Sequence, residues 1–82
     1  MHSCNVNKLT KIDNTFGMVL RKKRLCKKYT QEALSIESGL SRAYISELEM
    51  GHIVPSLYSI FKLAGALKIR VAYLINEIED LI

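Results

Sequence analysis

The sequence predicts an all-α fold, a compact bundle of five helices. Apolar residues recur at spacings of three and four along most of the chain, which is the period of an amphipathic helix. Ser or Thr precedes several of these periodic segments, and Gly follows the clearest of them, as expected at helix ends. The length of 82 residues, with 49% hydrophobic and 24% charged residues, fits one ordinary globular domain.

The N-terminal residues 1–13 are polar and have no clear period, so we expect a flexible arm, followed by a folded domain over residues 14–82. Either Asn14 or Thr15 can cap the first helix. The apolar stripe of this helix comprises Phe16, Val19, Leu20 and Leu25. Cys26, near its end, is expected to pack as a small apolar residue.

The central residues 31–49 predict two short helices joined by a tight turn. Thr30 caps the first helix, and Gly39 ends it because Gly adopts the left-handed conformation without a Cβ penalty. Ser41 caps the second helix, which covers residues 42–50. The inward-facing apolar positions are Leu34, Leu40, Ile45 and Leu48. The small side chains that let the two helices cross closely are Ser35 and Ser38. The arrangement is a helix-turn-helix.

The C-terminal part of the chain predicts two more helices after a loop at residues 51–55. Ser56 caps the first of them, and its apolar face comprises Leu57, Ile60, Phe61, Ala64 and Leu67. The last helix begins near Val71 and carries more apolar residues than a small core can bury. Its expected dimer interface comprises Leu74, Ile75, Ile78, Leu81 and Ile82. The alternative is that these residues fill the core of the monomer.

The charges are unevenly distributed. Residues 1–44 hold nine Lys or Arg against three Asp or Glu, a net +6, whereas residues 45–82 hold three against five, a net −2. The basic half indicates a polyanionic partner, and the alternative is a solvated face without a ligand. Neither an apolar signal segment nor a run near the ~18 residues of a membrane span is present, so we expect a cytoplasmic protein. The two histidines and two cysteines lack metal-ligand spacing, and no GxSxG occurs, so we expect no metal, no cofactor and no enzymatic activity.

The chain resembles the Cro/repressor (XRE) family of helix-turn-helix regulators, which includes phage repressors and restriction–modification controller proteins. The matching residues are TQEAL at 30–34, Gly39, Ser41, YIS at 44–46, ELEMG at 47–51 and Pro55. The resemblance runs from about Phe16 to Leu74 and departs from the family pattern at Ser35, where Ala is usual. It implies a lambda-repressor-like fold and a transcriptional regulator that binds a palindromic double-stranded DNA operator as a homodimer. It also implies a structural salt bridge between Arg24 and Glu49.

The second helix of the motif, residues 42–50, is expected to lie in the major groove of DNA. Its predicted base contacts are Arg42, Ala43, Ser46 and Glu47. Arg42 is the sharpest candidate, because a guanidinium can donate two hydrogen bonds to guanine. The alternatives are that Arg42 contacts a phosphate or pairs with a carboxylate. The predicted DNA backbone contacts are Gln31, Ser41, Tyr44, Arg21, Lys22, Lys27 and Lys28. For Tyr44 the alternative is partial packing against the end of the first helix.

A second function stays open at this point. The same five-helix fold can act as an antitoxin or adaptor that binds a protein partner, such as a toxin or RNA polymerase, through the last helix. The operator sequence and the sign of regulation cannot be deduced from these residues.

Overall fold

Five helices are found in the computed structural model, which describes residues 4–82 and the side chains from Lys11 onward. They are α1 (Cys4–Cys26), α2 (Gln31–Ser38), α3 (Arg42–Glu49), α4 (Leu57–Leu67) and α5 (Val71–Leu81). Residues 4–82 contain no strand, so the predicted all-α, five-helix fold is confirmed. The predicted start of the last helix at Val71 is also confirmed.

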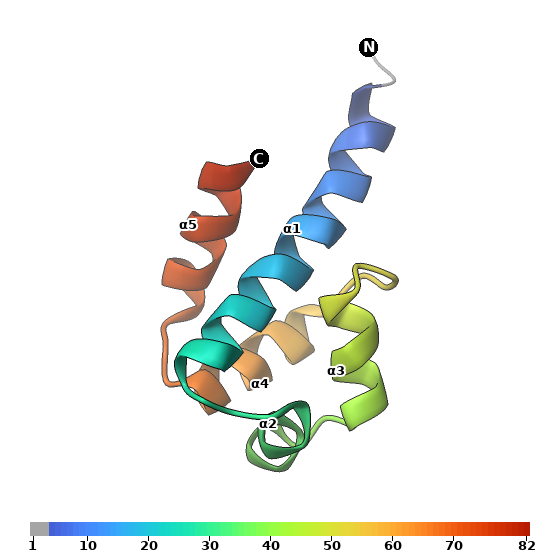
Figure 1. The fold of residues 1–82 in the computed structure, drawn as a ribbon. Helices are drawn as coiled ribbons and strands as arrows, with labels where there is room; N and C mark the ends of the chain where they lie inside the picture. The colour runs from blue at the N-terminus through green and yellow to red at the C-terminus, as the bar shows by residue number, and fades with distance from the viewer. Residues whose placement is uncertain (1–3) are drawn as a thin grey trace.

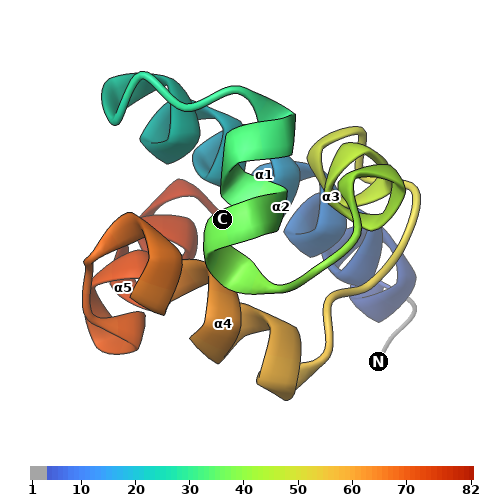
Figure 2. The same cartoon turned by 90° about the horizontal axis from the view of Figure 1, so that it is seen from below.

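The helices form one packed unit in which α1 is the longest element. In Figure 1, α5 runs beside α1, α4 lies across them, and α2 and α3 lie at the opposite end from the chain termini. Figure 2 views the same arrangement from below, with α2 in front and α3 beside it. The buried core comprises Phe16, Val19, Leu20, Leu34, Ile45, Leu48, Leu63, Ala64, Ala66, Leu67, Leu74 and Ile78. Every helix contributes to this core, so α2 and α3 are held on a common scaffold.

Side-chain caps begin the middle three helices as predicted. The hydroxyls of Thr30, Ser41 and Ser56 accept hydrogen bonds from the backbone N–H three residues further on, at Ala33, Tyr44 and Ser59. Gly39 ends α2 with a φ of +79°, which is the left-handed conformation that Gly adopts readily. These local signals explain why the bounds of α2 and α3 match the prediction closely.

The first helix begins ten residues earlier than the sequence predicts. Residues 4–13 continue α1 as a helix, so the prediction of a flexible arm is wrong for them, while residues 1–3 lie outside the described part of the chain. Neither Pro nor Gly occurs between residues 4 and 16 to stop a helix. A helix already nucleated by the packed segment around Phe16 extends with one hydrogen bond per added residue. In Figure 1 the first turns of α1 project beyond the other helices.

Several predicted core residues lie on the surface. Leu25 and Cys26 are exposed at the end of α1, so their predicted packing is wrong. On α4, Leu57 and Phe61 are 69% and 58% exposed, whereas Ala64 and Leu67 are buried as predicted. The buried face also includes Ser59, Leu63 and Ala66, which the sequence did not predict. The Ser59 side faces α3, where its Oγ lies 2.8 Å from the Tyr44 hydroxyl. The apolar face of α4 is therefore rotated relative to the prediction.

The last helix divides its apolar residues between the core and the surface. Leu74 and Ile78, four residues apart on one face, are buried within the monomer. Leu74 is completely buried, so the predicted dimer interface is wrong for this residue, whereas Ile78 keeps 6% of its surface exposed. Ile75, Leu81 and Ile82 remain exposed.

Candidate nucleic-acid interface

The outward face of α3 presents the four residues predicted to contact bases. Ile45 and Leu48 are fully buried, which fixes the rotation of the helix about its axis. The opposite face carries Arg42 and Ala43, which are exposed, and Ser46 and Glu47, which are half-buried. Positions i, i+1, i+4 and i+5 of a helix lie on one side. The geometry therefore brings this predicted set together on a single surface.

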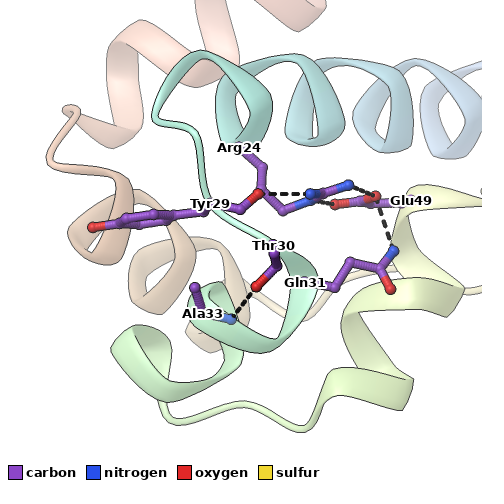
Figure 3. Close-up of polar contacts among 6 residues, drawn as sticks. All are labelled: Arg24, Tyr29, Thr30, Gln31, Ala33 and Glu49. Atoms are coloured by element: carbon purple, nitrogen blue, oxygen red, sulfur yellow. Dashed lines mark hydrogen bonds and ion pairs between the residues drawn. The ribbon is translucent and has the colours of Figure 1, made fainter.

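A buried ion pair holds the C-terminal end of α3 against α1. The Arg24 Nε donates to Glu49 Oε2 at 2.6 Å, and its Nη2 donates to Oε1 at 3.0 Å. The Arg24 Nη1 also donates to the carbonyl oxygen of Tyr29 at 2.8 Å. Both side chains are less than a tenth exposed. Figure 3 shows the guanidinium between these two acceptors. The predicted structural salt bridge is confirmed, with the bidentate geometry that Arg prefers.

Gln31 joins the same network from the start of α2. Its Nε2 donates to Glu49 Oε1 at 3.1 Å, as Figure 3 shows. The first backbone N–H groups of a helix have no intrahelical partner and carry the positive end of its dipole, so they attract phosphate. Gln31 itself is half-buried at this helix start, and the predicted backbone contact by Gln31 remains a prediction. The exposed carboxylate of Glu32 opposes the attraction at the same turn.

Tyr44 has a structural role. Its hydroxyl lies within hydrogen-bond distance of Ser59 Oγ, and the Ser56 hydroxyl donates to Ser59 Oγ at 2.9 Å. The ring packs against the core and is half-buried. The hydroxyl links α3 to α4 inside the domain, and its contact with phosphate remains a prediction. The partial packing named as the alternative is observed, with α4 as the neighbour and not the end of α1.

Glu47 is turned toward the loop that follows α3. Its Oε1 lies 3.4 Å from Nδ1 of His52, a contact that becomes an ion pair when the imidazole is protonated. Arg42 forms no ion pair with any residue of the part of the chain described at side-chain level. The alternative in which Arg42 pairs with a neighbouring carboxylate is therefore wrong. Its guanidinium stays available to a ligand.

The basic residues in and just after the last turns of α1 lie on different sides of this helix. Lys22 and Lys23 form ion pairs with Glu77 of α5, at 3.2 and 2.7 Å. The Lys22 side chain remains 65% exposed, and its predicted contact with the DNA backbone remains a prediction. Lys27 lies beside Leu67 and Ile69 at the far end of α4, and its contact remains a prediction.

Three other predicted backbone contacts are compatible with their positions. Arg21 and Lys28 are exposed, and Arg21 lies one turn before Arg24 on the outer surface of α1. Ser41 is exposed at the start of α3, where its hydroxyl caps the helix. Contacts from these residues to DNA remain predictions.

Two serine hydroxyls brace the turn between α2 and α3, a role that sequence reasoning missed. The Ser35 hydroxyl donates to the carbonyl oxygen of Leu40 at 2.5 Å, and the backbone N–H of Leu40 donates to Ser38 Oγ at 3.2 Å. The signal was the departure from the family pattern at Ser35, which was interpreted only as a small residue. Its hydroxyl adds a hydrogen bond that Ala cannot form.

No cluster of three or more His, Cys, Asp or Glu that could hold a metal occurs among the described residues. None of the helices described here is long and apolar enough to cross a membrane.

The geometry agrees with the comparison with known proteins. A profile of the helix-turn-helix family matches residues 20–74, which span the last turns of α1, all of α2, α3 and α4, and the first turn of α5. The chain belongs to the helix-turn-helix family. The matched segment includes the Arg24–Glu49 ion pair and the whole outward face of α3.

Helix-turn-helix proteins of known identity resemble this chain closely. An immunity repressor protein of Bacillus phage phi105 is 35% identical over 63 residues, covering 77% of this chain and 44% of the repressor. This chain therefore spans less than half the length of that curated relative. The crystal structure of the restriction-modification controller protein C.AhdI from Aeromonas hydrophila has a TM-score of 0.72 and 43% identity, covering 74% of this chain and 92% of that one.

A second controller protein, C.Esp1396I, was solved as a tetramer in complex with its natural 35 base-pair operator. It is 26% identical, with a TM-score of 0.78, and the match covers 84% of this chain and 91% of that one. These relatives confirm the resemblance to the Cro/repressor family and to the controller proteins within it. These relatives are a repressor and a controller protein, which are regulators. Their class agrees with the prediction of a protein without enzymatic activity.

Proposed function

We propose that this chain binds a specific palindromic double-stranded DNA operator as a symmetric dimer and thereby regulates transcription. The observation that carries the proposal is the outward face of α3, where Arg42, Ala43, Ser46 and Glu47 lie together on a rigidly held helix. A helix of this size fits the major groove of B-DNA, and Arg42 has the donors that recognise guanine. A regulator of this kind works in the compartment that holds the DNA, which in a bacterial-type cell is the cytoplasm.

The relatives support the same function. One is an immunity repressor, and another was solved on its own operator. The identity of 43% to a controller protein that is matched over 92% of its length supports a small regulator.

The groove between α1 and α5 is the surface that we assign to the dimer contact. It is lined by Ile12, Ile75, Ile78, Glu79 and Ile82. Ile12, Ile75 and Ile82 are each about two-fifths exposed, and Leu81 beside them is 51% exposed. A second copy of the same groove supplies a matching apolar surface across a two-fold axis. The recognition helices of such a dimer would read half-sites about 34 Å apart.

The test is selection of bound duplexes from a random pool, at roughly physiological salt so that loose phosphate binding is suppressed. We expect a palindrome whose half-sites are separated by about one helical turn. The Arg42→Ala variant, selected from the same pool, should lose the strongest guanine from the recovered sequence. Recovery of unrelated sequences by the wild type would refute specific binding, and it would favour the antitoxin or adaptor alternative, with a partner on α5.

A further inference from the structure

Helices α1 and α3 meet backbone to backbone at Gly17. A Cβ atom built on Gly17 would lie 2.5 Å from the carbonyl oxygen of Leu48 and 2.6 Å from that of Glu49. The carbonyl carbon of Glu49 would be 2.9 Å away. These atoms belong to the last turn of α3 and cannot move aside as a flexible side chain would. Gly17 therefore fixes how closely the end of α3 approaches α1.

Two other residues on the same face of α1 also contact the end of α3 or the loop that follows it. Asn14 lies against Gly51, where an added Cβ would collide with Oδ1 of Asn14, and Gly51 has a φ of +74°. Arg24 binds Glu49 two turns further along α1. Residues at positions 14, 17 and 24 of one helix face therefore contact consecutive parts of the segment that ends α3.

The other half of α3 is fixed by a different neighbour. Tyr44, in its first turn, is bonded to Ser59 of α4. A change in the separation of α1 and α3 at Gly17 therefore tilts α3 about its anchored first turn, because the two ends are held by different helices. A tilt displaces the outward face of α3 relative to α2, which carries the predicted phosphate contact of Gln31.

We propose that Gly17 is a positioning residue for sequence recognition, and that the absence of its side chain sets the tilt at which α3 meets base edges. The inference rests on the proposed function. Hydrogen bonds to base edges depend steeply on angle and distance, whereas attraction to phosphates does not. A misplaced α3 therefore loses discrimination between sequences while it keeps its general attraction to DNA.

The experiment compares Gly17→Ala with the matched control Gly65→Ala. Gly65 is an exposed residue inside α4, and a Cβ built there meets no atom within 4 Å. Both substitutions improve the intrinsic helix propensity, so neither is harmful by itself. The dissociation constants for the selected operator and for an unrelated duplex are measured for each protein by fluorescence anisotropy. Their ratio does not change if a variant merely has a smaller folded fraction, because both affinities then fall together.

For Gly65→Ala we expect both affinities to remain at the wild-type values. For Gly17→Ala we expect the ratio to fall about tenfold, the scale of one lost bidentate base contact. Asn14→Ala removes atoms from the same contact between α1 and the segment that ends α3, and it introduces no clash. It therefore tests the inference even if Gly17→Ala fails to fold. We expect the ratio of Asn14→Ala to fall about threefold, with Asn76→Ala on the exposed side of α5 as its control.

The outcomes separate the two proposals. A wild-type protein without preference for any duplex overturns the proposed function and this inference with it. If Gly17→Ala folds and keeps the wild-type preference for the operator over the unrelated duplex, the inference alone is overturned. If Gly17→Ala does not fold, the same preference in Asn14→Ala overturns the inference alone.

Discussion

Single residues in this domain divide into those that hold α3 and those that α3 offers to a partner. Glu49 belongs to the first group, since it accepts hydrogen bonds from both Arg24 and Gln31. Arg42 belongs to the second group, since it is exposed and unpaired within the part of the chain described at side-chain level. Substitutions in the two groups should therefore give different results.

Arg42→Ala should abolish most of the preference between operator and unrelated DNA. One bidentate contact to guanine is worth about 1–3 kcal/mol of discrimination, and its loss leaves general phosphate attraction in place. Anisotropy titrations with both duplexes at several salt concentrations provide the measurement. Arg70→Ala, which removes an exposed Arg at the start of α5, is the control for charge. Equal losses on the two duplexes for Arg42→Ala would exclude base recognition by this residue.

Glu49→Ala should destabilise the fold by about 3–5 kcal/mol, because it leaves the Arg24 guanidinium buried without its counter-ion. The free energy of unfolding from urea titrations gives the value. Asp80→Ala, at an exposed position on α5, should change it by no more than about 0.5 kcal/mol. The double variant Arg24→Met with Glu49→Leu should recover a large part of the loss. A single variant as stable as the wild type would show that the pair does not hold α3 in place.

At the scale of the helices, capping residues made the bounds of the short helices predictable from the sequence. Features that depend on packing between helices were harder to predict. The bounds of α2 and the start of α3 were predictable because Thr30, Ser41 and Gly39 act on their own backbone. The exposure of Leu57 and Phe61 on α4 was not predictable, because Leu63 and Ala66 offer a second apolar face and the period alone does not show which face packs inward. The outward set on α3 was predictable from the period of Ile45 and Leu48 alone.

The ion pairs between α1 and α5 should make stability depend on pH. Hydrogen bonds from Lys23 and Lys22 lower the pKa of Glu77 below its ordinary 4.5, and the bond to Glu77 raises the pKa of Lys23 above 10.5. A carboxyl group with a lowered pKa stabilises the fold above its unfolded pKa, and this contribution is lost as the pH falls through the folded value. On the lysine side, the contribution is present below 10.5 and is lost as the pH rises through the raised pKa.

Glu77→Gln should therefore melt at a lower temperature than the wild type at pH 7, and at nearly the same temperature at pH 3. The difference should be small and should shrink in high salt, because the pair is partly exposed. Thermal melts followed by circular dichroism measure both temperatures, with Asp80→Asn as the matched control on the same helix. A difference that persists unchanged at pH 3 would assign the effect to packing.

At the scale of the whole molecule, exposed apolar side chains lie on separate sides. One group lines the groove between α1 and α5, another comprises Met18 and Leu25 on α1, and Phe61 is exposed on α4, next to the end of α2. The sequence predicted an apolar surplus but placed it entirely on the last helix. Residues 4–13 were predicted to be an arm, so their contribution of Ile12 to the groove was not foreseen.

Leu81→Glu should convert the dimer to a monomer and reduce operator affinity, because the carboxylate would be buried in the contact. Phe61→Glu is the matched control, since the two side chains are 51% and 58% exposed. Sedimentation velocity at several protein concentrations reports the assembly state of each variant. Dissociation caused by Phe61→Glu, with Leu81→Glu still dimeric, would move the interface to the α4 surface.

The hydrogen-bond network around Glu49 is complete within the monomer, before any DNA is present. Recognition then resembles the docking of a preformed body, in which only exposed side chains such as Arg42 lose conformational freedom. Association with different duplexes should proceed at similar rates, because the same preformed surface makes every first encounter. Preference for the operator would then be expressed mainly in how long the complex lasts.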